Sequence, residues 1–182
     1  MSKFLKFYLN HMKKILFIIA HNDFQPIEYN VPKQILAQAG IEVVTVSDKS
    51  GVATAAQTGE KVLVDKTLEE IKDADYDGVF FIGGPGALEH LDDEKSYRLV
   101  REISQSGKLW GAICISPRIL AKAGVLQGKE VTGWDGDGEL AGILSSAGAK
   151  YIHQSVVVDG KLITAAGPRS AEEFGRKIAA LV

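Results

Sequence analysis

Two short runs of wholly apolar residues constrain the fold of this chain more than any other feature. The runs LFIIA, at 16–20, and VFFI, at 79–82, lack the alternation expected of a strand with one solvent-facing side. Such runs are typical of strands that are covered on both faces. They alternate along the chain with segments of helical periodicity. We therefore predict an α/β fold in which a mainly parallel sheet carries helices on both faces, a three-layer sandwich.

The composition is that of a single globular domain. The chain has 182 residues, of which 46% are hydrophobic and 24% are charged, and its formal net charge is −2. This length is sufficient for one domain with a sizeable core. We predict a single α/β domain over residues 13–182 and an N-terminal extension over residues 1–12. The apolar run after Lys13 and Lys14 is too short for the core of a signal peptide.

Charge, hydropathy and cysteine content restrict the partners and the compartment. The slightly negative net charge gives no reason to expect nucleic acid or an anionic membrane as a partner, and no apolar run is long enough to span a membrane. One cysteine cannot form an internal disulfide, which indicates a reducing compartment, and we expect the cytoplasm. No arrangement of histidines and carboxylates has the spacing of metal ligands, so we predict neither a metal nor a cofactor.

Candidate site residues follow three of the predicted strands. Ligands of parallel sheets bind beyond the carboxyl ends of the strands. At those ends the sequence has the segments HNDFQPIE, GGPGALEH and CISPR, at 21–28, 83–90 and 114–118. The last of these contains Cys114, the single cysteine. We expect the three segments to meet at one edge of the sheet.

Cys114 lies where a predicted strand runs directly into a predicted helix. Such a junction forces a sharp turn that exposes the side chain, as in a nucleophile elbow. Ser116 can cap the following helix and Pro117 suits its first turn. The positive end of the helix dipole would favour the thiolate. The alternative is an inert cysteine buried in a strand, and placement alone leaves both interpretations open.

Glu28 and His21 are candidate partners of the cysteine. Burial could keep Glu28 partly protonated so that it shares a proton with the thiol, although an acidic residue at a helix start also favours the dipole. The GGPG segment, including Gly84, offers backbone N–H groups suited to an oxyanion, or is only a turn. His21 could serve as an auxiliary acid or base, or be a solvated loop residue.

Three longer segments together resemble the ThiJ/PfpI superfamily, a group that includes protein deglycases and PfpI-type intracellular peptidases. The segments are GAICISPRILAKAGVLQGKEVTG, FFIGGPGA and EYNVPKQILAQAGIEVV. The resemblance runs from Lys13 nearly to Val182. It implies a flavodoxin-like sandwich that usually forms a homodimer, with Cys114 as the nucleophile and Glu28 as its protonated partner. By the same resemblance, Gly84 and the Ile115 N–H would be the oxyanion donors.

Departures from the family pattern narrow the function. Ile115 stands where the peptidase branch of the family has a histidine, and Leu88 stands where that branch has an acid. Trp134 stands where the deglycase branch has a histidine. A Cys-His-acid triad is therefore not evident. Asp135 and Asp137 look like turn residues, and Arg118 either orients an anionic substrate or is solvated.

Two classes of function remain open. In the first, the chain is an enzyme that hydrates a small reactive carbonyl, methylglyoxal, to lactate. Cys114 attacks the aldehyde and Glu28 moves the proton between the two carbons. In the second, the chain is a non-enzymatic sensor of oxidative stress or a chaperone that uses the same cysteine. An intracellular cysteine peptidase is the less favoured enzyme.

Overall fold

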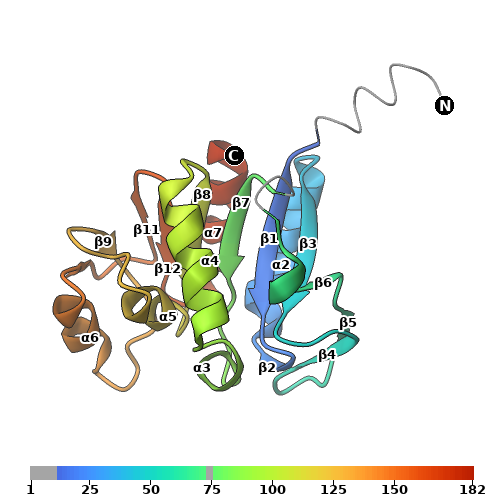
Figure 1. Cartoon of the computed structure of the whole chain (residues 1–182), viewed down its shortest axis with the longest axis horizontal. Coiled ribbons are helices and arrows are strands. Elements are labelled where there is room, and N and C mark those ends of the chain that lie inside the picture. The colour runs from blue at the N-terminus through green and yellow to red at the C-terminus, as the bar shows by residue number, and fades with distance from the viewer. Residues whose placement is uncertain (1–11, 73–75) are drawn as a thin grey trace.

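A seven-stranded sheet forms the centre of the molecule (Figure 1). The computed structural model describes residues 12–72 and 76–182, so the predicted extension, apart from Met12, lies outside the described residues. The strand order is β11-β12-β8-β7-β1-β3-β6, and all neighbours are parallel except β11 and β12. The strands are β1 (Lys14–Ile19), β3 (Glu42–Ser47), β6 (Lys66–Thr67), β7 (Gly78–Phe81), β8 (Leu109–Ile113), β11 (Val156–Asp159) and β12 (Leu162–Ala165).

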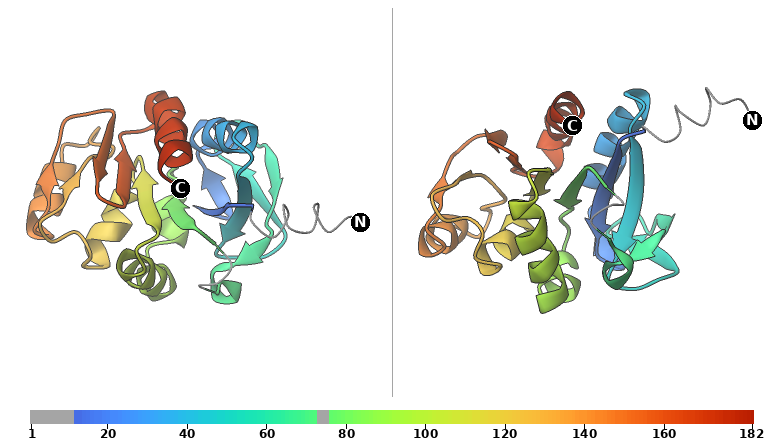
Figure 2. Two further views of the ribbon diagram at one scale, coloured as in Figure 1. Left: turned by 90° about the horizontal axis from the view of Figure 1, so that it is seen from above. Right: turned by 45° about the horizontal axis from the view of Figure 1, so that its top comes forward.

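Helices cover both faces of this sheet, as predicted. Helices α2 (Pro26–Gln38) and α7 (Ala171–Leu181) lie side by side on one face, and α4 (Glu94–Gln105) and α5 (Pro117–Lys122) on the other (Figure 2). A further helix, α6 (Leu140–Ser146), packs against α5. The sheet therefore separates two hydrophobic cores.

Alternate residues of the apolar strands point into the two cores. From β1, Ile15, Phe17 and Ile19 join the core under α2 and α7, whereas Leu16 and Ile18 join the core under α4 and α5. Every one of these side chains is at most 1% exposed. Coverage on both faces explains why the sequence of this strand has no polar alternation. The α/β prediction from the apolar runs is confirmed.

Short elements complete the fold. Strands β4 (Val52–Ala55) and β5 (Lys61–Leu63) form an antiparallel hairpin, and β2 (Asn22–Phe24) extends it to three strands. The other short elements are η1 (Leu68–Glu70), α3 (Ala87–His90), β9 (Glu130–Val131), β10 (Lys150–Tyr151) and η3 (Pro168–Ser170). Within the described ranges, no helix has the length and apolarity needed to cross a membrane.

Two glycines provide a matched test of the packing. A Cβ at Gly111, in the middle of β8, would lie 1.7 Å from the carbonyl oxygen of Ile163 on β12, whereas a Cβ at Gly142, in α6, would have no atom within 4 Å. We expect Gly111→Ala to lower the free energy of unfolding by at least about 3 kcal/mol. Gly142→Ala should raise it by about 0.5–1 kcal/mol, because alanine favours the helix. Urea unfolding measures both, and an unchanged stability of Gly111→Ala would contradict the close approach of β8 and β12.

Candidate active site

Cys114 occupies a sharp turn between β8 and α5. Its φ of 65° lies in the left-handed region, which a residue with a Cβ adopts only when its surroundings impose it. Two backbone hydrogen bonds do so here. The Cys114 N–H donates to the carbonyl of Ala165 over 2.9 Å, and the Cys114 carbonyl accepts from the Trp134 N–H over 2.7 Å. The expected turn is therefore present, and its strain is held from both sides.

Glu28, in the first turn of α2, has no solvent exposure and lies beside the thiol. Its Oε2 accepts a hydrogen bond from the Gly83 N–H over 3.0 Å, and its carboxyl group is also hydrogen-bonded to Cys114. A Cβ at Gly83 would lie 2.6 Å from both the Cβ of Cys114 and Oε2 of Glu28. Only glycine fits between the two side chains, so Gly83 permits the contact on which the site is built.

Burial sets the proton affinity of both groups. It raises the pKa of Glu28 from 4.5 to about 7, against smaller lowering effects of the Cys114 and Gly83 hydrogen bonds. Burial also raises the pKa of the Cys114 thiol, and the charge and hydrogen bond of Glu28 raise it further. The two groups therefore titrate as a pair, which loses its first proton near neutral pH.

The helix that follows Cys114 does not make it a resting thiolate, and this corrects the expectation from the dipole. Burial and Glu28 raise the pKa of the thiol by more than the backbone N–H groups of Ile115 and Gly84 lower it. Ser116 does not cap the helix, because its hydroxyl donates to the Ile82 carbonyl over 2.8 Å. The thiol needs a base to become a nucleophile, and Glu28 is in place to act as that base.

Two backbone N–H groups reach the sulfur atom. Those of Ile115 and Gly84 donate hydrogen bonds to Cys114, and both lower the pKa of the thiol. Gly84 has a φ of 122°, and a Cβ there would lie 2.5 Å from the Asp23 carbonyl oxygen. Glycine thus lets this loop pack tightly against the segment before α2. The structure brings together four of the five predicted site residues: Cys114, Glu28, Gly84 and Ile115.

The histidines have other partners. Nε2 of His21, the fifth predicted site residue, lies 3.2 Å from the Ser50 carbonyl oxygen. Nδ1 of His90 lies 3.7 Å from Oδ2 of Asp48. The ring of His153 stacks at 4.2 Å on Tyr151. None of these three residues has a hydrogen bond to Cys114 within the part of the chain that the structure describes. His11 lies outside that part. No cluster of His, Cys, Asp and Glu suited to a metal ion occurs among the described residues either.

One oxygen of Glu28 faces a segment that sequence reasoning did not identify. Its Oε1 is buried and has no nitrogen or oxygen atom as a hydrogen-bond partner. A Cβ at Gly167 would lie 4.0 Å from this oxygen. Residues 166–170, which follow β12, line a cavity of about 320 Å³. A glycine two residues after the end of a strand, at the same edge as Cys114, was the available signal for this part of the site.

The raised pKa of Glu28 makes stability depend on pH in a defined direction. The folded protein keeps a proton on Glu28 that the unfolded chain releases above about pH 4.5, so this contribution is complete below that pH and is lost as the pH rises through about 7. A Glu28→Gln variant has no such group. We expect the free energy of unfolding of the wild type, relative to this variant, to fall by about 3 kcal/mol over that interval. Urea unfolding at several pH values measures the difference, and a constant difference would contradict a raised pKa.

Comparisons with known proteins identify the family of this chain. A sequence model of the DJ-1/PfpI family matches residues 13–181. An uncharacterized protein of Methanocaldococcus jannaschii is 37% identical over 166 residues, which cover 91% of this chain and 80% of that protein.

Solved structures have the same fold. A ThiJ/PfpI domain protein from Brachyspira murdochii superposes with a TM-score of 0.87 at 26% identity, covering 93% of this chain and 96% of the other. Drosophila melanogaster DJ-1beta superposes with a TM-score of 0.83 at 30% identity, covering 93% and 90%. The fold is therefore the flavodoxin-like sandwich that the resemblance implied. Together with the match over nearly the whole described domain, these similarities show that the chain belongs to the DJ-1/PfpI family.

Proposed function

We propose that this protein is a cofactor-independent enzyme that hydrates small 2-oxoaldehydes, with methylglyoxal converted to lactate. The observation that carries the proposal is the buried contact between Cys114 and Glu28, with a Glu28 pKa of about 7. The DJ-1/PfpI family contains glyoxalase, deglycase and peptidase enzymes, which agrees with a catalytic use of such a pair. The arrangement suits a reaction that needs one nucleophile and one acid–base group.

Glu28 first activates the thiol. A general base works best when its pKa lies near the working pH, and Glu28 meets this condition. It accepts the thiol proton while the sulfur of Cys114 adds to the aldehyde carbon, and it then donates that proton to the resulting oxyanion. The product of this step is a hemithioacetal, whose oxygen is bonded to the carbon that carries the sulfur. We assign the N–H groups of Gly84 and Ile115, which both act on Cys114, as the donors to that oxygen.

A proton transfer between adjacent carbons completes the conversion. Glu28, again a carboxylate, removes the proton from the former aldehyde carbon and returns one to the former ketone carbon. The hydroxyl proton of the hemithioacetal passes to the former ketone oxygen, so a thioester carbonyl forms on one carbon and a hydroxyl on the other. The aldehyde carbon is thereby oxidised and the ketone carbon reduced within one molecule, so no external oxidant or reductant is needed. The result is a thioester of lactate on Cys114. Water cleaves it, which releases lactate and a proton and regenerates the thiol.

The arrangement also bears on the other two functions. The same N–H groups of Gly84 and Ile115 could hold the oxygens of a sulfinate, which is the observation that favours a redox sensor as the second candidate. A peptidase must protonate an amine leaving group, usually from a histidine. His21, His90 and His153 all have partners other than Cys114, which argues against peptide hydrolysis.

Steady-state conversion of methylglyoxal to lactate tests the proposal. Cys114→Ala and Glu28→Gln should each lower kcat/KM by at least about 100-fold, because one removes the nucleophile and the other its base. Glu89→Gln, which neutralises an exposed carboxylate in α3, is the matched control and should keep full activity. Absence of turnover by a wild-type protein with a reduced thiol, together with stoichiometric consumption of that thiol by peroxide, would favour the sensor instead.

The pH dependence of kcat/KM gives a second test. The Cys114–Glu28 pair must lose one proton before Glu28 can accept another from the thiol. We therefore expect kcat/KM to rise with pH and to reach half its maximum near pH 7. The residual activity of Glu28→Gln should lack this rise. A wild-type profile that is flat between about pH 5 and 8 would argue against Glu28 as the base.

A further inference from the structure

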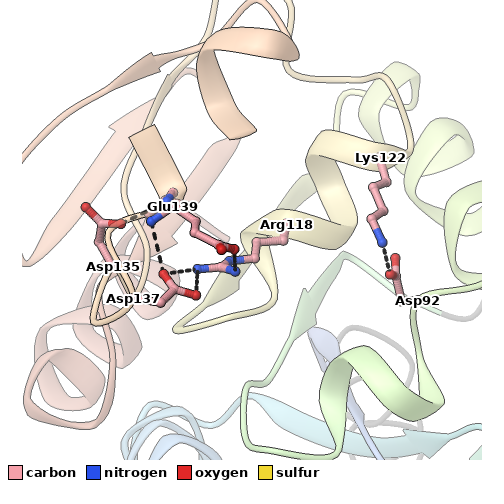
Figure 3. A network of polar contacts seen from close by, with 7 residues as sticks. Asp92, Arg118, Lys122, Asp135, Asp137 and Glu139 are labelled. Atoms are coloured by element: carbon pink, nitrogen blue, oxygen red, sulfur yellow. Dashed lines mark hydrogen bonds and ion pairs between the residues drawn. The ribbon is translucent and has the colours of Figure 1, made fainter. Parts of the chain in front are cut away.

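Arg118, in the first turn of α5, is a buried cation with a defined partner. The residue is 6% exposed, and its Nη2 donates to both carboxylate oxygens of Asp137, over 2.7 and 2.8 Å. Its Nη1 lies 3.6 Å from Oε2 of Glu139. Figure 3 shows the guanidinium between these two carboxylates. Neither expectation for Arg118, substrate orientation or solvation, describes this contact, and Asp137 is more than a turn residue.

Arg118 and Asp137 close the segment of residues 133–139, which we call the Trp134 loop. Asp137 also accepts a hydrogen bond from the Glu139 N–H over 3.1 Å, and Asp135 accepts one from the Leu140 N–H over 2.8 Å. The guanidinium of Arg118 lies 5.6 Å from the ring of Trp134. The loop is thus tied to α5 by an ion pair and by a cation–π contact.

The Trp134 loop in turn holds the backbone of Cys114. The Trp134 N–H donates to the Cys114 carbonyl over 2.7 Å. That carbonyl belongs to the same peptide group as the Ile115 N–H, which donates to the sulfur. A trans peptide group is planar, and its C=O and N–H point in opposite directions. A hydrogen bond that fixes the carbonyl therefore also aims the Ile115 N–H at the sulfur and polarises it.

We propose that Arg118 is a positioning residue for the nucleophile. Its ion pair with Asp137 holds the Trp134 loop in place, and the Trp134 N–H of that loop orients the Cys114–Ile115 peptide group. The tryptophan that stands at a family histidine position then acts on the cysteine through its backbone. This inference deepens the proposed function and rests on it for its catalytic meaning. The orientation of the peptide group, however, affects the reactivity of the thiol itself, whatever the substrate is.

The energetics favour positioning over stability as the role of this ion pair. Arg118 is buried, so its charge is costly to remove from water, whereas Asp137 is exposed, so solvent weakens the attraction between the two charges. An ion pair of this kind contributes little net stability. The Nε of Arg118 is buried and has no hydrogen-bond partner among the described residues, which adds a further cost. The two charge-assisted hydrogen bonds from Nη2 to Asp137, by contrast, define the position of the loop carboxylate.

Alkylation of the thiol by iodoacetamide tests the proposal without a substrate. Cys114 is the only cysteine, so the reaction reports on this residue alone. We expect Arg118→Met to lower the second-order rate constant at neutral pH by about tenfold, because the Ile115 N–H no longer favours the thiolate. Lys122→Met is the matched control, since Lys122 lies one turn further along α5 and pairs with Asp92, outside the Trp134 loop (Figure 3). It should change the rate constant by less than about twofold.

Asp137→Asn breaks the same ion pair from its more exposed side and keeps the test valid if Arg118→Met does not fold. It should lower the rate constant by a similar factor, and the double variant should show no further loss, since both changes remove one interaction. Unchanged or faster alkylation in folded Arg118→Met or Asp137→Asn would overturn the proposal.

Turnover separates this inference from the proposed function. If the wild type converts methylglyoxal, both variants should lower kcat with little change in KM. An equal loss in Lys122→Met would overturn the positioning role. If the wild type shows no turnover but alkylation falls as expected, the positioning role stands and only the proposed function fails.

Discussion

The contact between the buried carboxyl of Glu28 and the thiol of Cys114 is the interaction on which the rest of the site depends. A carboxyl group without solvent exposure is costly unless it is protonated or hydrogen-bonded. Burial raises the pKa of Glu28 to about 7, so the group holds its proton up to neutral pH, and it also accepts a hydrogen bond from the Gly83 N–H. The contact exists only because residue 83 lacks a side chain. Three loops at one edge of the sheet must therefore meet within a few ångströms, and the parallel register of β1, β7 and β8 brings them there.

Backbone groups supply most of the polar chemistry around the sulfur. The N–H groups of Gly84 and Ile115 reach it directly, and the N–H of Trp134 acts on it through the Cys114 carbonyl. This explains how the site can contain a tryptophan and an isoleucine beside the nucleophile. A backbone N–H is present whatever the side chain, so the arrangement depends on the path of the chain. The chain follows this path only because Cys114 adopts a left-handed φ, which is strained for a residue with a Cβ.

The Arg118–Asp137 pair shows how side chains that do not touch the reacting atoms can hold the backbone around the cysteine in this conformation. Helix α5 begins three residues after the cysteine, so a side chain in its first turn can reach the loop that covers the elbow. The pair lies at the end of α5 that is nearer the nucleophile, and the Lys122–Asp92 pair lies one turn away from it. The two ion pairs of this short helix thus contact different segments: Arg118 contacts the Trp134 loop, and Lys122 contacts Asp92.

The sequence alone determined the layers of the fold and the place of the site. Apolar runs without alternation required a sheet covered on both faces, and Cys114, Glu28, Gly84 and Ile115 followed strand ends or began helices at one edge. Only the tertiary structure decided the protonation of the thiol, the hydroxyl contact of Ser116, the partner of Arg118 and the other partners of the histidines. Strand and helix patterns are local and repeat along the chain, so a sequence displays them. Burial and hydrogen-bond partners depend on residues that are distant in sequence, and folding alone brings those residues together.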